Sequence, residues 1–108
     1  MMLVKQSMVT RLEITEVPRL DPIRVYLENY EPGKGRITIS CSVAAWVGYW
    51  GAMGDRTVEK FFIDCDAEYL AGNLGCASAL SRASCHRNYL VRVIEAVQQA
   101  LREQVHAA

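Results

Sequence analysis

Residues 31–55 read EPGKGRITISCSVAAWVGYWGAMGD and decide the fold, because they hold the clearest turn, a strand pattern and both tryptophans. The segment 32–35, Pro-Gly-Lys-Gly, is typical of a turn, since proline presets φ and glycine tolerates a positive φ. After it, residues 36–43 alternate between polar and apolar side chains, which predicts a half-buried strand. The residues predicted to face inward are Ile37, Ile39, Cys41 and Val43.

Two further strands are predicted before this turn. Residues 9–17 alternate with Leu12 and Ile14 on one side, and residues 23–29 alternate with Ile23, Val25 and Leu27 on one side. The five-residue link between the second and third strands predicts a hairpin with a longer loop. Three strands that each have one polar side predict an antiparallel sheet with one face exposed to water.

The aromatic segment 44–50 has two interpretations. Its Trp, Val and Tyr residues favour a fourth strand. Gly48 and Gly51 weaken that pattern and indicate a bulge or a close approach by other backbone. The sequence therefore leaves open whether the sheet has three or four strands.

Helical periodicity begins after this segment. Asp55 is the predicted N-cap of a first helix, whose apolar stripe is Val58, Phe61, Phe62 and Cys65. Asp66 is the predicted cap of a second short helix, which ends at 73–75 and has the stripe Tyr69, Leu70 and Leu74. Residues 75–85 are predicted to form a loop.

A long amphipathic helix is predicted over 87–105, with Ser84 or Asn88 as its cap. Its stripe is Leu90, Val93, Ile94, Val97, Leu101 and Val105. The predicted fold is therefore α+β: a three- to four-stranded antiparallel sheet from the N-terminal half, packed on one face by two short helices and one long C-terminal helix. We expect a single domain over 9–108 and a flexible tail over 1–8.

Composition restricts the function classes. Twelve basic and twelve acidic side chains in 108 residues cancel, which argues against a general binder of phosphate backbones. No apolar run is long enough for a transmembrane helix, so no membrane partner is expected. The first residues lack the apolar core of a signal peptide, so we expect a cytoplasmic location and reduced cysteines.

The cysteines and histidines form no strong metal motif. Cys41 and Cys65 lie on predicted apolar faces, where free cysteine behaves as a small hydrophobe. Cys76, Cys85 and His86 are the nearest approach to a metal-binding group, but the short paired spacings typical of zinc sites are missing. We expect no catalytic residues, no cofactor and no enzymatic activity, and the sequence leaves open whether those three residues bind a metal.

The aromatic group Trp46, Tyr49 and Trp50 is the first candidate for a partner-binding surface, because Trp and Tyr dominate binding hot spots. The alternative is that a tryptophan fills the core under the helices. With three large rings so close together, we expect at least one inside and at least one partly exposed. The last part of the segment, with Gly51 and Gly54, is expected to contribute to the same surface.

Charged residues supply two further candidates. Asp55, Glu59 and Asp64 could form an acidic face for a basic partner, although helix caps and a solvated face explain part of this cluster. Arg82, Arg87 and Arg92 could contact phosphates in a nucleic-acid-binding protein. We rank nucleic-acid binding lower, because the net charge of the chain is zero.

Several segments resemble a family of small proteins encoded by temperate phages and prophages of enteric bacteria. The resemblance rests on RLEI at 11–14, EPGKGRITI at 31–39, and YWGAMGDRT at 49–57, with further agreement at 69–71 and 89–93. It covers most of 9–105 and is weakest across 75–86.

The resemblance implies a setting and supplies no catalytic residues. Small accessory phage proteins often bind and disable host enzymes, including restriction and CRISPR machinery. By association, the resemblance implies a binding protein that inhibits or redirects a host protein by stoichiometric binding, either anti-CRISPR-like or anti-restriction-like. The alternative is a small nucleic-acid-binding regulator, and the oligomeric state is open.

Overall fold

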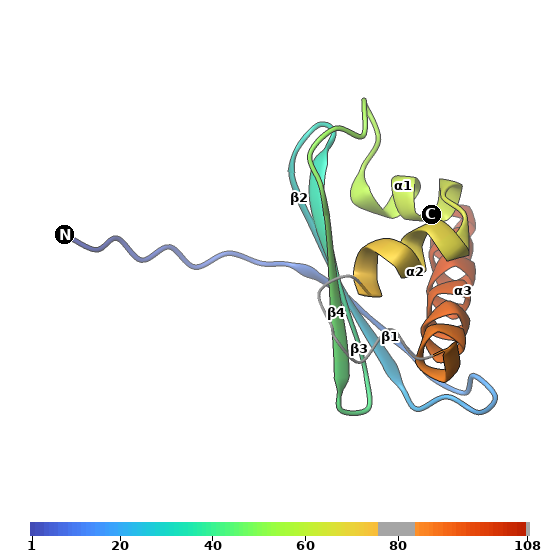
Figure 1. The fold of residues 1–108 in the computed structure, drawn as a ribbon. Coiled ribbons are helices and arrows are strands. Elements are labelled where there is room, and N and C mark those ends of the chain that lie inside the picture. The colour runs from blue at the N-terminus through green and yellow to red at the C-terminus, as the bar shows by residue number, and fades with distance from the viewer. Residues whose placement is uncertain (76–83, 108) are drawn as a thin grey trace.

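The structure is a computed structural model that describes residues 1–75 and 84–107. Its elements, in chain order, are β1 (Thr10–Ile14), β2 (Ile23–Glu31), β3 (Lys34–Cys41), β4 (Ala44–Trp50), α1 (Val58–Asp64), α2 (Ala67–Gly75) and α3 (Ser84–Ala107). The four strands form one antiparallel sheet in the order β1-β2-β3-β4. All three helices lie on one side of this sheet, and the N-terminal segment extends away from it (Figure 1). The α+β prediction is confirmed, and residues 44–50 are a strand.

The core lies between the sheet and the helices. In the two central strands, Val25 pairs with Ile39 and Ile23 pairs with Cys41, and all four side chains are fully buried. Such cross-strand pairs of apolar side chains are a main source of sheet stability. The helices cover them with Val58, Phe62, Leu70, Leu74, Leu90, Val93, Ile94, Val97 and Leu101.

The prediction that Val43 faces inward is wrong, because Val43 lies in the turn between β3 and β4. This side chain is fully exposed, because the strand ends at Cys41 and a two-residue turn, Ser42–Val43, connects it to β4. Ser42 has a φ of +57°, the positive value that a type II′ hairpin turn needs at its first central position. The inward alternation therefore stops two residues earlier than the sequence pattern indicates.

The hairpin between β2 and β3 is also tighter than predicted. Its loop is the two residues Pro32 and Gly33, where a five-residue link was expected. The φ of +83° at Gly33 places the positive φ at the second central position, as in a type II turn. Such a turn fits strand twist poorly, and a register shift between Asn29 and Glu31 accommodates it as a bulge.

The predicted cap of the first helix is wrong. Thr57, not Asp55, is the N-cap of α1, and its side chain accepts a hydrogen bond from the Lys60 N–H at 3.3 Å. Asp55 instead lies in a turn with Gly54, whose φ is +70°, two residues before this cap. The predicted cap of α2 is confirmed, because Asp66 Oδ2 accepts from the Tyr69 N–H at 3.3 Å.

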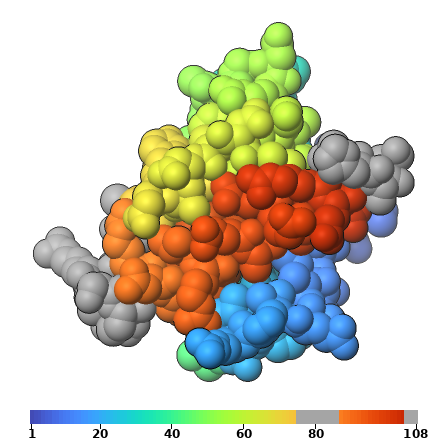
Figure 2. Space-filling view, turned by 90° about the vertical axis from the view of Figure 1, so that its right-hand side faces the viewer, coloured from blue at the N-terminus to red at the C-terminus, as the bar shows by residue number. Residues whose placement is uncertain are grey.

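The long helix begins earlier than predicted. Residues 84 and 85, assigned to a loop by the sequence pattern, are the first residues of α3. The predicted stripe is confirmed from Leu90 to Leu101. The side chain of Val105 and residues 76–83 of the predicted loop lie outside the part that the structure describes. In Figure 2, α3 crosses the helical face between α1 and α2 on one side and the blue N-terminal part on the other. None of the described helices is long and apolar enough to cross a membrane.

Candidate functional site

The predicted aromatic group is divided between the two faces of β4. Because successive side chains of a strand point to opposite faces, Trp46 and Trp50 face the helices and Tyr49 faces the opposite side. The Trp50 ring lies 5.2 Å from the Phe61 ring, and its Nε1 donates to the Tyr69 hydroxyl at 3.3 Å. Both tryptophans are half-buried against the core, whereas Tyr49 is 53% exposed.

Gly48 makes room for this tryptophan packing. A Cβ at this position would lie 2.7 Å from Leu74 Cδ2 and 2.7 Å from the Trp50 ring. The glycine therefore serves close packing of side chains over the strand, and the strand continues through it without a bulge against β3. The predicted close approach comes from side chains instead of backbone.

The open face of the sheet carries an aromatic pair that the sequence pattern missed. The Tyr30 and Tyr49 ring centroids are 6.3 Å apart, and the two side chains are 51% and 53% exposed. Tyr30 lies at the bulge of β2, where the register shift interrupts the simple alternation. A pattern of period two cannot assign a face to a residue at a bulge, so only the pairing register could have found this neighbour.

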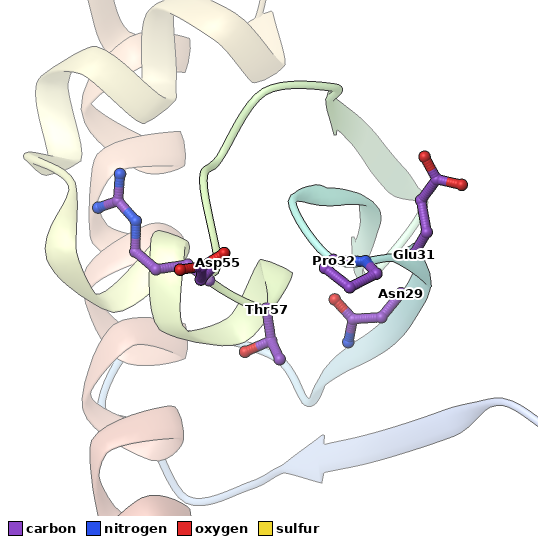
Figure 3. Close-up of a pocket in the computed structure, with 6 residues that line it drawn as sticks. Asn29, Glu31, Pro32, Asp55 and Thr57 are labelled. Atoms are coloured by element: carbon purple, nitrogen blue, oxygen red, sulfur yellow. The ribbon is translucent and has the colours of Figure 1, made fainter.

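A pocket of about 320 Å³ lies at the same end of the sheet. It lies between the β2–β3 turn and the segment before α1, and Figure 3 shows Asn29 and Pro32 across from Asp55 and Thr57. Its lining residues are Asn29, Glu31, Pro32, Asp55, Arg56 and Thr57. The predicted site residue Asp55 is therefore part of a concave surface.

One backbone contact holds the two walls of this pocket together. The Met53 N–H donates to the Gly33 carbonyl at 2.9 Å. A Cβ on Gly33 would collide with the Gly54 carbonyl oxygen, and the φ of +83° disfavours other residues as well. The turn signal at 32–35 thus shapes the pocket in addition to reversing the chain.

The acidic residues predicted for the site have different environments. Glu59 Oε1 accepts a hydrogen bond from Asn29 Nδ2 at 2.8 Å. Asp64 is paired with Arg56 at 3.6 Å and with Lys60 at 3.3 Å. Because these pairs are close to solvent, each contributes little to the stability of the fold. The basic side chains beside Asp64 also reduce the negative charge that it presents to a partner.

A further ion pair lies at the β2–β3 turn. Lys34 Nζ is 2.8 Å from Glu31 Oε1. The hydrogen bond and the charge of Glu31 raise the pKa of Lys34 above its usual value. Lys34 therefore keeps its positive charge at neutral pH beside the pocket.

Two of the three arginines predicted for nucleic-acid binding, Arg87 and Arg92, make hydrogen bonds within the protein. Arg87 donates to the Glu68 carboxylate at 3.3 Å and to the Glu68 carbonyl at 3.2 Å. Arg92 donates to the Arg19 carbonyl at 3.0 Å. Arg82 lies outside the described residues, so the predicted group of three arginines is not tested.

Cys41 and Cys65, whose side chains the structure describes, pack as free thiols against the core. Cys41 is buried, donates from Sγ to the Asp21 carbonyl at 3.4 Å, and accepts from the Tyr89 hydroxyl at 3.1 Å. This hydrogen bond, with burial, raises the pKa of Tyr89 to about 12. Cys65 is half-buried, and its burial raises the pKa of its thiol, which disfavours the reactive thiolate.

The candidate metal group stays untested. Cys76 lies outside the described residues, and the side chains of Cys85 and His86 are not described. Among the side chains that the structure describes, no three His, Cys, Asp or Glu residues are grouped so that they could hold a metal ion.

Comparison with known proteins gives the setting. Residues 2–82 match the model of a protein family described as a phage family. The chain belongs to this family. The matched part contains the whole sheet, α1 and α2, and so it contains the pocket and the Tyr30–Tyr49 pair. No curated protein matches the chain, and no solved structure matches it.

Proposed function

We propose that this phage protein is a binding protein that inhibits or redirects a host protein by stoichiometric binding, without enzymatic activity. The proposed place of action is the host cytoplasm, and the proposed partners are components of a defence system, such as a CRISPR or restriction complex. Membership of a phage family supports the setting. The observation that carries the proposal is the exposed Tyr30–Tyr49 pair, at the same end of the sheet as a pocket that contains Asp55.

The physical case rests on how such a surface binds. Tyrosine presents a large, amphipathic area with few rotatable bonds, so little side-chain entropy is lost on binding. Tyr30 and Tyr49 are already in contact, which orders their rings before a partner arrives. We propose that this pair contacts the partner and that Asp55 receives a basic side chain in the pocket.

The test measures binding and phage defence together. The protein is expressed in a set of hosts that each carry one defined defence system, and phage plating is measured together with co-purification of the defence complex. We expect the wild type to restore plating and to elute with its target in a fixed ratio. Tyr49→Ala is expected to weaken binding by about thirtyfold and to lose the effect on plating, because truncation at a hot spot costs about 2 kcal/mol.

Val43→Ala is the matched control, since Val43 is fully exposed at the β3–β4 turn, away from the pocket. This variant is expected to behave as the wild type. A Tyr49→Ala protein that is folded and still protects phage would contradict the assigned surface. Wild-type protein that changes plating on none of the defended hosts would contradict the function.

A nucleic-acid-binding regulator is the second candidate, with a different surface from the one predicted. Tyr26, Tyr30 and Tyr49 lie on the open face with Arg36, and tyrosines on a four-stranded sheet can stack on unpaired bases. It ranks second because Arg11 and Arg24 on this face both pair with Glu13, at 3.1 and 3.4 Å. A gel shift whose affinity falls steeply with salt would favour it.

A further inference from the structure

The two edges of the sheet differ in their protection. β1 is an edge strand of five residues that carries the charges of Arg11 and Glu13. β4 is the other edge, with seven residues, AAWVGYW, that include no charge and no proline. Natural proteins protect an edge with charges, prolines or short strands, because an unprotected edge is a template for another strand. β4 lacks all three protections.

The pairing register shows which backbone groups of β4 are available. Cys41 and Ala44 flank the two-residue turn and therefore form a hydrogen-bonded pair. Hydrogen-bonded and non-hydrogen-bonded pairs alternate along an antiparallel ladder, so Ala44, Trp46, Gly48 and Trp50 are bonded to β3. The N–H and C=O groups of Ala45, Val47 and Tyr49 therefore point away from β3. Among the described residues, no strand pairs with this side of β4.

The sequence of β4 is complementary to itself in one antiparallel register. A two-fold axis through Val47 places Val47 opposite its own copy, Trp46 opposite Gly48, Ala45 opposite Tyr49, and Ala44 opposite Trp50. Each large aromatic side chain then faces a small one on the other strand. Directly opposite side chains are the closest contacts across a ladder, so this arrangement avoids clashes between rings.

From this edge we infer that β4 pairs with β4 of a second copy of this chain, antiparallel and centred on Val47. The two four-stranded sheets join into one continuous sheet through about six backbone hydrogen bonds. No charges of like sign meet in β4, since the strand carries none. The inference goes beyond the proposed function, because a monomer could bind a host protein equally well.

Light scattering of purified protein over a range of concentrations tests the pairing. We expect the wild type to show the mass of a dimer and Val47→Lys to show the mass of a monomer, because two lysines would meet at the axis. Val9→Lys is the matched control, since Val9 is 49% exposed and Val47 is 47% exposed, and Val9 precedes the opposite edge strand. This control should remain a dimer. A monomeric wild type, or equal effects of the two lysines, overturns the inference.

Cross-linking tests the register separately. In Val47→Cys the two Cα atoms would lie about 5.5 Å apart, within the range of a disulfide. In Ala45→Cys the two equivalent atoms would lie about 14 Å apart, since four residues along the strand and the spacing between the strands separate them. Under a mild oxidant we expect a covalent dimer from Val47→Cys and no more than the wild-type background from Ala45→Cys. Equal cross-linking of both variants overturns the register.

A variant without residues 1–8 distinguishes the occupant of the edge. These residues are exposed and include Met2, Leu3 and Val4, so a tail from another copy is the competing strand. If β4 pairs with β4, the shortened protein remains a dimer with the same cross-link at position 47. Loss of the dimer on removal of the tail overturns the inference.

Discussion

Asn29 in β2 holds the start of α1, since its Oδ1 accepts a hydrogen bond from the Val58 N–H at 2.7 Å. The Nδ2 of the same side chain donates to Glu59 at 2.8 Å. A helix leaves its first N–H groups without internal partners, and here a strand residue supplies one of them. One amide therefore ties the sheet to the helix and forms part of the pocket wall.

Asn29→Ala is predicted to destabilise the protein by about 1–2 kcal/mol, because the half-buried end of α1 loses a hydrogen-bond acceptor. Chemical denaturation monitored by circular dichroism measures the change. Asn88→Ala is the control, since Asn88 is exposed on α3, and its effect should stay within about 0.5 kcal/mol. Equal stability of the two variants would contradict this role of Asn29.

Gln98→Leu is predicted to destabilise the protein by about 1–3 kcal/mol. Gln98 is 5% exposed, and its Nε2 donates to the Phe62 carbonyl at 3.0 Å and to the Cys65 carbonyl at 2.8 Å. Leucine would leave both carbonyls at the end of α1 without this donor.

The neighbouring residue provides a control of the same chemistry. Gln99 is exposed and donates only to Glu103 in its own helix. Gln99→Leu should change the free energy of unfolding by no more than about 0.5 kcal/mol. Thermal melting of both variants checks the difference, and a neutral Gln98→Leu would show that α1 ends without help from α3.

Trp50→Ala and Tyr49→Ala are predicted to separate stability from binding. Trp50 is half-buried against Phe61, so its truncation should cost about 2–3 kcal/mol, less than for a fully buried ring. Tyr49 lies on the open face, and its truncation should cost less than about 1 kcal/mol. Melting temperatures compare the two. A stable Trp50→Ala protein that loses partner binding would instead assign Trp50 to the partner surface, as the sequence predicts.

Alkaline pH is predicted to destabilise the protein through Tyr89. Its pKa is raised from 10.0 to about 12 in the folded state, mainly by donation to Cys41 and by burial. The folded state therefore holds this proton more tightly, so the stabilisation is present below pH 10 and is lost as the pH rises toward 12. Unfolding free energies measured across this window should fall less steeply in Tyr89→Phe, which has no hydroxyl to ionise. Identical slopes would contradict the assignment.

The sequence by itself determined three of the four strands, the presence of the three helices and the inner face of the two central strands. Alternation at 23–29 and 37–41 is a local property of the chain, and burial of one side of each strand follows directly from it. The stripe from Leu90 to Leu101 determined the buried face of α3 in the same way. Both patterns arise because side chains that face the core are apolar and side chains that face solvent are polar, and this periodicity can be read from the local sequence.

Tertiary structure alone decided the candidate site. The bulge between Asn29 and Glu31 brings Tyr30 beside Tyr49, and the hydrogen bond of Asn29 fixes the start of α1. Each of these contacts depends on which strand pairs with which, and in what register. A local pattern carries no information on pairing between distant segments, so the sequence could supply the aromatic residues but not their neighbours or their faces.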